Sequence, residues 1–188
     1  MNSYQIDTVL NLSLSKIHGG VYPADRLPEI PNTFDRPKAF VANTDNHDFP
    51  GQHWVAFYFP SKGPSEYFDS YGLPPWKSQF LDFLEAHYVI NPKVLQSSIS
   101  ELCGQYCIMY LMLRAKDFSQ TAILSIFSQD TLQNDKIVET FYNSLQISLP
   151  LPQAKQSTPT CQICLSRKAV EIPLEQTLTK YSKSGICF

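Results

Sequence analysis

The sequence predicts an α+β domain over residues 1–148, followed by a linker and tail over residues 149–188. Apolar residues make up 43% and charged residues 17% of the 188 positions, which is typical of a globular chain with one core. Segments rich in β-branched and aromatic residues lie between segments with helical spacing, without regular strand–helix alternation. Three prolines in "SLPLPQAKQSTPT" (148–160) then break the pattern and mark the domain boundary.

The N-terminal segment predicts a helix over 4–17, with Ser3 as a suitable cap and Gly19-Gly20 as its end. Four prolines between residues 21 and 38 predict an ordered loop without regular structure. The apolar residues at helical spacing are Ile6, Val9, Leu10, Leu14 and Ile17.

Three strands are predicted next. "KAFVAN" (38–43) is a short strand, and "HWVAFYF" (53–59) has the strongest strand composition in the chain. The turn residues around 61–65 lead into "EYFDSYG" (66–72), which we expect to pair with 53–59 as a hairpin.

Helices dominate the remainder. A helix is predicted over 74–88, with Pro75 at its start. Residues 94–100 form a short strand or loop, and a strongly apolar helix spans 103–115. Two amphipathic helices are expected near 119–128 and 133–146. The residues expected on one buried face of the 74–88 helix are Trp76, Phe80, Phe83 and Leu84.

Two of the five cysteines, Cys103 and Cys107, lie at the start of the apolar helix. A thiol at a helix N-terminus meets the positive end of the helix dipole and unpaired N–H groups, both of which favour the thiolate. One turn further along, burial among apolar residues raises the pKa of a thiol. The spacing therefore predicts Cys103 as the reactive cysteine and Cys107 as a packing residue.

A cysteine nucleophile requires a general base. Of the four histidines, His18 and His87 lie at predicted helix ends and His47 lies in a loop. His53 opens a predicted strand directly after "PGQ", where a rigid scaffold can direct a side chain into a cleft. We therefore select His53 as the candidate base, with an ordinary strand-end histidine as the alternative.

Asp69 lies within the otherwise apolar segment 66–72, where an unpaired buried carboxylate is costly. Antiparallel pairing in the hairpin is expected to place the segment around His53 opposite the segment around Asp69. Asp69 is then placed to accept the ring N–H of His53 and fix its tautomer. The alternative is a strand-end or turn carboxylate without a catalytic role.

An oxyanion requires a donor besides the backbone N–H of Cys103. Gln96 lies seven positions before Cys103, in a segment that passes close to the helix start. Its carboxamide offers an uncharged donor, which cannot neutralise a thiolate. Gln105 and Gln52 are competitors for this role by composition.

The order "GQHWVAFYF", "EYFDSYG", a glutamine and "ELCGQYC" resembles the adenovirus-type cysteine endopeptidases (adenain) and the related proteases of Maverick/Polinton elements. It is more distantly similar to the deSUMOylating Ulp/SENP peptidases. The resemblance extends upstream through "FVANTDNHDFPGQHW" and covers roughly residues 1–148. The combination of motifs is specific, whereas each motif alone is not.

The resemblance implies a papain-like cysteine protease core, in which a central mixed sheet packs against helices and the nucleophile starts a buried helix. It assigns His53 as base, Asp69 as orienting acid, Gln96 as oxyanion donor and Cys103 as nucleophile. Trp54 and Gly104 are assigned to the substrate cleft, with Trp54 stacking near the base. Asp69 departs from the Glu that is usual in adenovirus enzymes and is closer to the Ulp type.

The resemblance also bears on cofactors and partners. Adenovirus proteases are stimulated by DNA and by a viral peptide that forms a disulfide with an enzyme cysteine located between the acid and the nucleophile. No cysteine lies between Asp69 and Cys103, and the net charge of −2 weighs against strong DNA binding. We expect no cofactor for the chemistry itself, with a peptide or DNA activator as an open alternative.

We expect a monomer that acts on polypeptides and is intracellular, with the nucleus and the virion as candidate locations. The N-terminus lacks the pattern of a signal peptide, and no apolar run approaches the roughly 18 residues of a membrane span. A metal site is not predicted, because "CQIC" with Cys187 lacks a fourth ligand in the tail; the cysteines concerned are Cys161, Cys164 and Cys187.

The sequence therefore predicts a cysteine endopeptidase that cleaves capsid or core precursors of a virus or virus-like transposon at Gly-containing sites. One alternative is an isopeptidase that processes or deconjugates ubiquitin-like modifiers. Another is a non-catalytic module that binds peptides.

Overall fold

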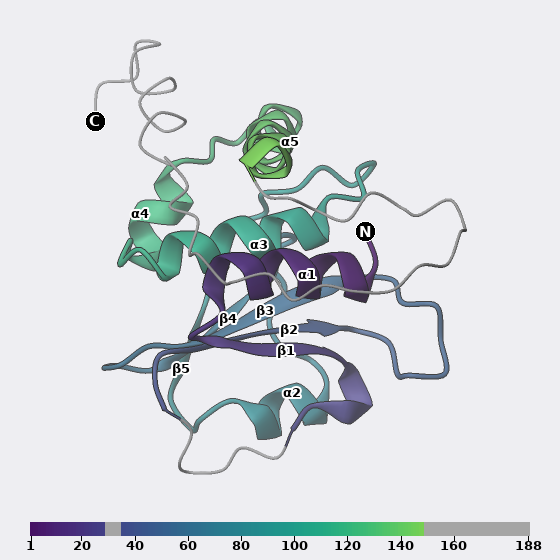
Figure 1. Ribbon diagram of the computed structural model, residues 1–188, viewed down its shortest axis with the longest axis vertical. Coiled ribbons are helices and arrows are strands. Elements are labelled where there is room, and N and C mark those ends of the chain that lie inside the picture. The colour runs from purple at the N-terminus through teal and green to yellow at the C-terminus, as the bar shows by residue number, and fades with distance from the viewer. Residues whose placement is uncertain (29–34, 149–188) are drawn as a thin grey trace, which may run out of the picture.

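A computed structural model describes residues 1–28 and 35–148, which form a five-stranded sheet with helices on both faces (Figure 1). The elements are α1 (Ser3–Leu14), β1 (His18–Pro23), the 3₁₀ helix η1 (Ala24–Arg26), β2 (Lys38–Asn43), β3 (Trp54–Phe59), β4 (Ser65–Phe68), α2 (Ser78–Phe83), β5 (Tyr88–Ile90), α3 (Cys103–Arg114), α4 (Gln120–Ser125) and α5 (Thr131–Ser148). The predicted tail over 149–188, with its three cysteines, lies outside the described residues.

The strands lie side by side in chain order, and the sheet is mixed. β2, β3 and β4 pair antiparallel, while the outer strands β1 and β5 pair parallel with β2 and β4. The predicted strands at 38–43 and 53–59 are confirmed as β2 and β3 within one residue. This mixed sheet with helices on both faces confirms the predicted α+β class.

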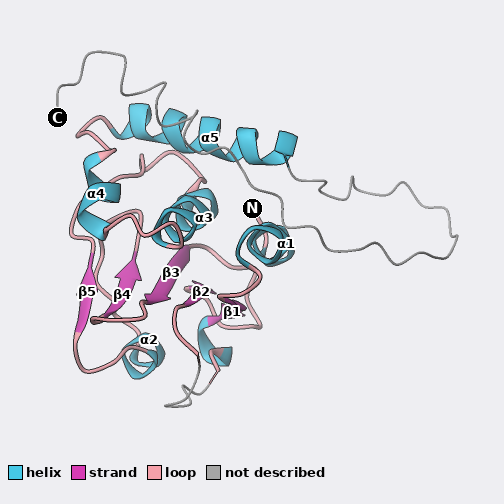
Figure 2. Ribbon diagram, turned by 60° about the vertical axis from the view of Figure 1, so that its left-hand side comes forward, coloured by secondary structure: helices cyan, strands magenta, loops and turns pink. Residues whose placement is uncertain are grey.

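Each face of the sheet packs against its own core. Figure 2 shows α1, α3 and α5 on one side of the sheet and α2 with η1 on the other. Alternate residues of β3 point to opposite cores, and all six are buried. A side chain attached to the start of β3 is therefore held by a strand that is packed on both faces.

The predicted helix over 103–115 is confirmed as α3, in which ten of twelve residues are buried. Its C-terminal end is fixed to β4 by Arg114, whose Nε and Nη2 donate to the two carboxylate oxygens of Glu66, each at 2.7 Å. The hydroxyl of Tyr110 also donates to Glu66, at 2.5 Å. These bonds attach the C-terminal end of α3 to β4, and they thereby help to fix the orientation of the helix whose N-terminal end carries Cys103.

The start of α1 differs from the prediction. Asn2 caps the helix instead of Ser3: its side chain accepts a hydrogen bond from the backbone N–H of Gln5 at 2.9 Å, and the Gln5 side chain accepts from the N–H of Asn2 at 3.0 Å. The helix ends at Leu14, so that Ile17 lies outside it.

The pair Gly19-Gly20 does not stop a helix but lies inside β1, and the loop expected over 21–38 begins with strand residues as far as Pro23. A side-chain carbon on Gly19 would lie 2.1 Å from the ring of Phe40, so that glycine is needed for the strand to pass this closely. The pairing of β1 with β2 outweighs the local preference of the two glycines for a turn.

β4 ends at Phe68, so Asp69 is not inside a strand over 66–72 as predicted. Asp69 begins a turn in which its carbonyl accepts from the N–H of Gly72 at 2.8 Å. The strand stops here because the side chain of Asn91 bonds to both backbone groups of Asp69.

The helix predicted over 74–88 is shortened to α2, and the chain enters β5 at Tyr88. Trp76 lies before the helix and is 62% exposed, not on a buried face. Prolines 74 and 75 precede Trp76 and restrict the backbone of this connection. The apolar residues of this segment that are buried as predicted are Phe80, Phe83 and Leu84.

Segment 94–100 is a loop, and the last two predicted helices are confirmed as α4 and α5 with shifted ends. The side chain of Ser119 caps α4 by accepting from the N–H of Ala122 at 3.1 Å. Among the described residues, no helix combines the length and apolar character needed to cross a membrane.

Candidate active site

Cys103 is the first residue of α3 and is 8% exposed. The first N–H groups of a helix have no partner within the helix, and they point toward the space in front of its first turn. The positive end of the helix dipole lies at the same place and favours a negatively charged sulfur. Cys103, which the sequence predicts to be the reactive cysteine, therefore lies at the N-terminal end of a buried helix.

Cys107 has a different environment. It is fully buried, and its thiol donates to the backbone carbonyl of Trp54 at 3.4 Å. Burial raises the pKa of Cys107 well above its ordinary value, and the nearby Cys103 raises it further. A neutral, packed thiol fits the prediction that Cys107 is a packing residue.

His53 directly precedes β3, and its backbone carbonyl accepts from the N–H of Thr44 at 2.8 Å. The ring nitrogen Nε2 lies 2.9 Å from Oδ1 of Asp69, and the side chain is 15% exposed. The His53 ring also interacts with the side chain of Cys103, which contributes to raising the pKa of the ring. Because Nε2 is directed to Asp69, the nitrogen that faces Cys103 is Nδ1.

The charge on His53 depends on these two contacts. Burial alone would lower the pKa of His53, but hydrogen bonds to Asp69 and Cys103 outweigh this effect and raise the pKa to about 9, from 6.5. At neutral pH the ring is therefore an imidazolium beside the sulfur of Cys103. A cation beside a cysteine is one of the surroundings in which cysteines act as nucleophiles.

Asp69 is 1% exposed and is held from both sides. Its Oδ1 accepts from His53 and from the backbone N–H of Tyr71 at 2.8 Å. Its own backbone N–H donates to Oδ1 of Asn91 at 2.8 Å, and Nδ2 of Asn91 donates to its carbonyl at 2.7 Å. These contacts hold the Asp69 carboxylate in place independently of its contact with His53.

The ring of Tyr71 stacks on His53, with ring centroids 5.0 Å apart and planes inclined by 29°. This contact restricts rotation of the His53 side chain. Trp54 had been expected in this place. No feature of the sequence distinguished Tyr71 from the other tyrosines.

Gln96 is buried in the loop that precedes α3. Its Oε1 accepts from the hydroxyl of Ser70 at 2.7 Å, and its Nε2 donates one of two N–H bonds to the carbonyl of Ser100 at 2.8 Å. The backbone carbonyl of Ser70 accepts from the N–H groups of Leu95 and Gln96 at 2.9 and 3.0 Å. Because Ser70 follows Asp69, the carboxamide of Gln96 and the carboxylate of Asp69 are held by the same turn.

The loop with Gln96 is also fixed from α5. The hydroxyl of Tyr106 lies 2.9 Å from Oδ1 of Asp135 and 3.1 Å from the carbonyl of Leu95. Nδ2 of Asn134 donates to the same carbonyl at 3.0 Å. These polar residues on α5 hold the loop in front of α3, and nothing in the helical pattern of the sequence indicated this role.

Trp54 and Gly104, the two residues assigned to the cleft, both contact the N-terminal segment. Nε1 of Trp54 donates to the carbonyl of Met1 at 3.2 Å. A side-chain carbon on Gly104 would lie 3.2 Å from Sδ of Met1 and 3.1 Å from Cδ1 of Ile6. Glycine at this position allows the start of α1 to pack directly beside the residue that follows Cys103.

The other three histidines, His18, His47 and His87, have different surroundings and do not contact Cys103. Nε2 of His18 pairs with Asp7 at 2.8 Å, and Nδ1 of His47 pairs with Asp25 at 2.6 Å. His87 is exposed in the bend before β5. The structure thus brings together His53, Asp69 and Cys103, with Gln96 in the adjoining loop.

Comparisons of the sequence and the structure with known proteins give one partial structural match to report. No family model matches the chain, and no curated protein matches it. Among solved structures, the chain is similar to one described as "Crystal Structure of Se-Met ASFV pS273R protease", with 31% identity and a TM-score of 0.36. The match covers 50% of this chain and about two fifths (41%) of that one. With backbone overlap this limited, the chemistry of the site must be argued from its own geometry.

Proposed function

We propose that the chain is a cysteine peptidase with Cys103 as nucleophile, His53 as acid and base, and Asp69 as the orienting acid. The observation that carries the proposal is one imidazole, that of His53, which lies 2.9 Å from Asp69 and also interacts with the side chain of Cys103 at the N-terminus of a buried helix. A nucleophile, a base and a group that orients the base are the three parts that nucleophilic catalysis by cysteine requires. The fold proposed with this activity is the papain-like core of the adenain and Ulp type.

In the acylation step, the Cys103 thiolate attacks the carbonyl carbon of a peptide bond and forms a C–S bond. The electron pair of the carbonyl moves to its oxygen, which becomes the oxyanion of a tetrahedral intermediate. Nδ1 of the His53 imidazolium then gives its proton to the nitrogen of the leaving amine, and the C–N bond breaks. A thioester on Cys103 and a neutral imidazole remain.

In the deacylation step, the neutral imidazole accepts a proton from water as the water oxygen attacks the thioester. The tetrahedral intermediate expels the Cys103 sulfur as thiolate, and the carboxylic acid product leaves. The proton on Nδ1 restores the imidazolium–thiolate pair. Asp69 keeps its charge throughout and stabilises the protonated ring.

We propose that the oxyanion accepts hydrogen bonds from the backbone N–H of Cys103 and from the carboxamide of Gln96. The N–H of Cys103 belongs to the unpaired first turn of α3. The carbonyl of Ser100 can only accept, so its bond with Nε2 fixes which end of the Gln96 carboxamide carries the donors, and it uses one of the two N–H bonds; the hydroxyl of Ser70 then donates to Oε1. The second N–H bond is the one proposed for the oxyanion.

The proposed substrates follow from the resemblance described above. They are capsid or core precursor proteins of a virus or virus-like transposon, cleaved at sites that contain glycine. The chemistry needs no cofactor, because nucleophile, acid and base are all side chains of the chain. Processing of ubiquitin-like modifiers uses the same chemistry on another protein and is an arm of the test below.

The test is turnover of fluorogenic peptides with Gly-containing sites and of a ubiquitin-like fusion, with purified wild type, Cys103→Ala and Cys107→Ala. We expect Cys103→Ala to lose at least ~10³-fold in kcat/KM, since it removes the nucleophile. Cys107→Ala should remain within about tenfold, since its sulfur packs in the core. Preference for the fusion over the peptides would favour deconjugation.

Two results would contradict the proposal. One is equal activity of wild type and Cys103→Ala. The other is no turnover by wild type with either substrate class, even after addition of DNA and of peptides from candidate capsid precursors. The second result would favour the non-catalytic binding module.

A further inference from the structure

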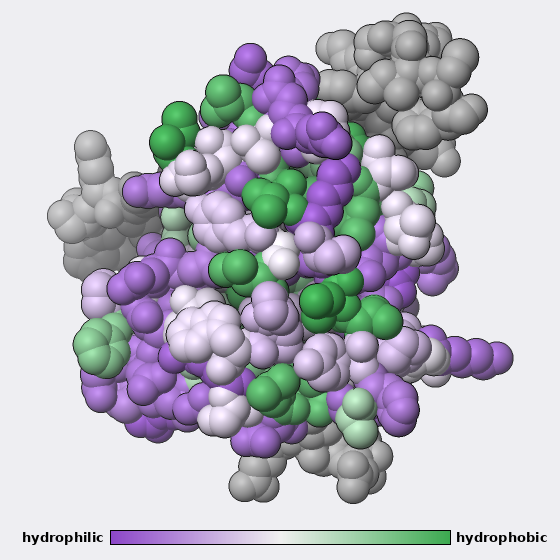
Figure 3. All heavy atoms as spheres, turned by 180° about the vertical axis from the view of Figure 1, so that it is seen from behind, coloured by the Kyte–Doolittle hydropathy of each residue, from purple (hydrophilic) through white to green (hydrophobic). Residues whose placement is uncertain are grey.

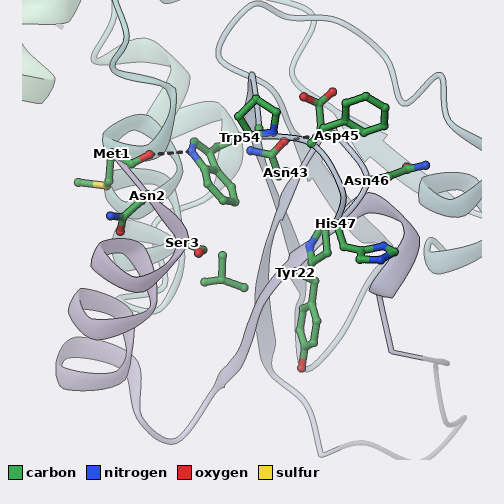
Figure 4. Close-up of a pocket in the computed structure, with 14 residues that line it drawn as sticks. Met1, Asn2, Ser3, Tyr22, Asn43, Asp45, Asn46, His47 and Trp54 are labelled. Atoms are coloured by element: carbon green, nitrogen blue, oxygen red, sulfur yellow. Dashed lines mark hydrogen bonds between the residues drawn. The ribbon is translucent and has the colours of Figure 1, made fainter.

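A pocket of about 320 Å³ lies between the start of α1, the ends of β1 and β2 and the loop over 45–51. On the face in Figure 3, in contrast, apolar side chains lie in small groups between polar ones, as is ordinary for a globular protein. Figure 4 shows Asp45 and Asn46 along one rim of the pocket and Met1 with Trp54 along the other. The pocket is thus bounded by two separate segments of the chain.

The rim with Asp45 and Asn46 contains two buried acceptors that the fold leaves unpaired. Oδ2 of Asp45 and Oδ1 of Asn46 are buried from water, and neither has a hydrogen-bond partner among the described residues. A buried acceptor in this situation costs free energy until a donor reaches it. Two such oxygens on neighbouring residues that line one pocket fit a ligand that brings several N–H donors.

The backbone of this rim is fixed without the help of these two side chains. The N–H of Asp45 donates to Oδ1 of Asn43 at 2.8 Å, and the carbonyl of Asp45 accepts from the N–H of Ala24 at 2.9 Å. The carbonyl of Asn46 accepts from the N–H of Phe49 at 3.0 Å. The two unpaired oxygens therefore belong to a loop that is already ordered, which lowers the cost of binding a ligand there.

The charges around the rim favour a cation. Asp45 has no ion-pair partner among the described residues, the N-terminal amine included. No lysine or arginine of the described residues lines the pocket, and the ring nitrogens of His47 are directed to Asp25 at 2.6 Å and to Asp48 at 2.9 Å. Arg26 lies outside the lining, 3.9 Å from Asp25. The carboxylate of Asp45 thus attracts positive charge into the pocket.

Three aromatic residues, Tyr22, Phe49 and Trp54, supply apolar walls. The polar atoms of two of them are already used, because the Tyr22 hydroxyl donates to the carbonyl of Gly19 at 3.0 Å and Nε1 of Trp54 donates to Met1. Their ring surfaces remain available to an apolar stem, and an aromatic face also attracts a cation. The pocket therefore combines apolar walls with two acceptors at one rim.

We propose that this pocket binds a primary ammonium group on an apolar stem, with Asp45 and Asn46 accepting its N–H bonds and the aromatic rings packing on the stem. An ammonium group offers three donors from one atom, so it can reach acceptors on neighbouring residues. Lysine side chains and free alkylamines share this chemistry. The site is separate from the proposed peptidase chemistry, because neither His53 nor Cys103 lines the pocket.

The test is a titration of the isotopically labelled full chain at constant ionic strength, followed by NMR at the backbone amides of 45–51 and the indole N–H of Trp54. The probe is N-acetyl-lysine-N′-methylamide, for which we expect saturable shifts with a Kd roughly in the millimolar range. The trimethyllysine analogue keeps the charge and the stem but has no N–H donor, and the norleucine analogue has the stem without the ammonium group. Both should bind at least about tenfold more weakly.

A second arm changes the protein. Asp45→Asn keeps the shape of the side chain but removes its charge, and it should weaken binding of the lysine probe by at least about tenfold. Asp48→Asn is the matched control: it removes the same charge from the same loop, but its side chain is 74% exposed and does not line the pocket, so binding should stay within about twofold. Asn46→Ala removes the other acceptor without a change in charge, should also weaken binding, and serves if Asp45→Asn does not fold.

A third arm separates the two sources of the ligand. n-Butylammonium carries the same group without a peptide backbone. Binding of this amine as tightly as the lysine probe assigns the pocket to free alkylamines. Binding at least about tenfold weaker assigns it to a lysine side chain within a polypeptide, because the flanking backbone then contributes contacts.

Three results would overturn the site. The first is the absence of saturable shifts at 45–51 and Trp54 with the lysine probe and with n-butylammonium. The second is equal binding of the lysine and trimethyllysine probes, since recognition would then not involve the acceptors. The third is equal losses in Asp45→Asn and Asp48→Asn, which would show attraction to the charge of the whole loop instead of binding in the pocket.

Discussion

At the scale of single residues, the pKa of His53 predicts the alkaline limit of activity. The ring must be protonated to pair with the thiolate and to give its proton to the leaving amine, and its pKa is raised to about 9. We therefore expect kcat/KM to fall as pH rises through about 9. Asp69→Asn removes the charge that helps to raise this pKa, so the alkaline limb should move to lower pH and kcat should fall by about 10²-fold or more.

The same shift links pH to stability. A histidine whose folded pKa lies above the unfolded value of 6.5 stabilises the fold fully below 6.5, and this contribution is lost as pH rises from 6.5 through about 9. Urea unfolding of wild type should show this loss, and Asp69→Asn should show less of it. An alkaline limb that stays at the same pH in Asp69→Asn would contradict the proposed role of the carboxylate.

Asn91 is expected to act as a positioning residue, since it touches Asp69 but neither His53 nor Cys103. Asn91→Leu keeps the approximate volume but releases both backbone groups of Asp69. We expect kcat to fall by about tenfold or more and the pKa of His53, followed by NMR, to drop from about 9 toward 6.5.

Asn134→Leu is the matched control for this prediction. It removes an equally buried carboxamide that also bonds to the backbone, at Leu95, but that does not touch Asp69. Both variants should lose stability, since each leaves buried backbone groups unpaired. Only Asn91→Leu should change the titration of His53; equal changes in both variants would reduce Asn91 to a structural role.

The side chains proposed to carry the chemistry could be named from the sequence, but those that position them could not. Cys103 could be selected from its place at the start of an apolar helix, and His53 from its place at the start of the segment with the strongest strand composition. Asn91 and Tyr71 lie in connections, where no periodic pattern indicates which way a side chain points. Their roles depend on the turn after Phe68 and on the pairing of β4 with β5, which brings Asn91 beside Asp69.

At the scale of elements, the prediction succeeded where local pattern and tertiary packing agree. α3 is apolar on most sides and β3 is buried on both faces, so both were evident in the sequence. β5 was missed because it has three residues, two of them exposed, and therefore no buried face to give a pattern. β1 was missed because its two glycines favour a turn until β2 supplies a partner.

The pair Glu66–Arg114 predicts how α3 depends on β4. Both side chains are largely buried, and removing one partner leaves an uncompensated charge. Arg114→Met should therefore lower the free energy of unfolding by about 3 kcal/mol, measured by urea denaturation. The double variant Glu66→Gln with Arg114→Met should recover part of this loss, whereas additive losses would show that the two side chains contribute independently.

At the scale of the whole molecule, the proposed site joins parts of the chain that are distant in sequence. His53 comes from the start of β3, Asp69 from the end of β4, and Cys103 from the start of α3. Gln96 comes from a loop that α5 holds in place through Asn134 and its neighbour. The proposed peptidase activity therefore requires β3, β4 and α3 to be assembled, with α5 packed against the loop that carries Gln96.

The role of α5 predicts where the chain can be shortened. α5 gives the core four apolar side chains, and the polar residues at its start fix the loop with Gln96; the four are Val138, Phe141, Tyr142 and Leu145. A chain that ends at residue 130 lacks this helix, exposes the face of α3 that it covers, and should show no cooperative unfolding transition.

A chain that ends at residue 148 keeps α5 and every contact described above. It should unfold within about 2 °C of the full chain and alkylate Cys103 at the same rate, as expected if the predicted boundary between domain and tail is correct. A decrease of Tm by more than about 5 °C would mean that residues 149–188 contribute to the folded core, and the domain would then have to include them. Unchanged stability with reduced turnover would instead assign the tail to substrate binding, because the core and the alkylation of Cys103 would both be intact.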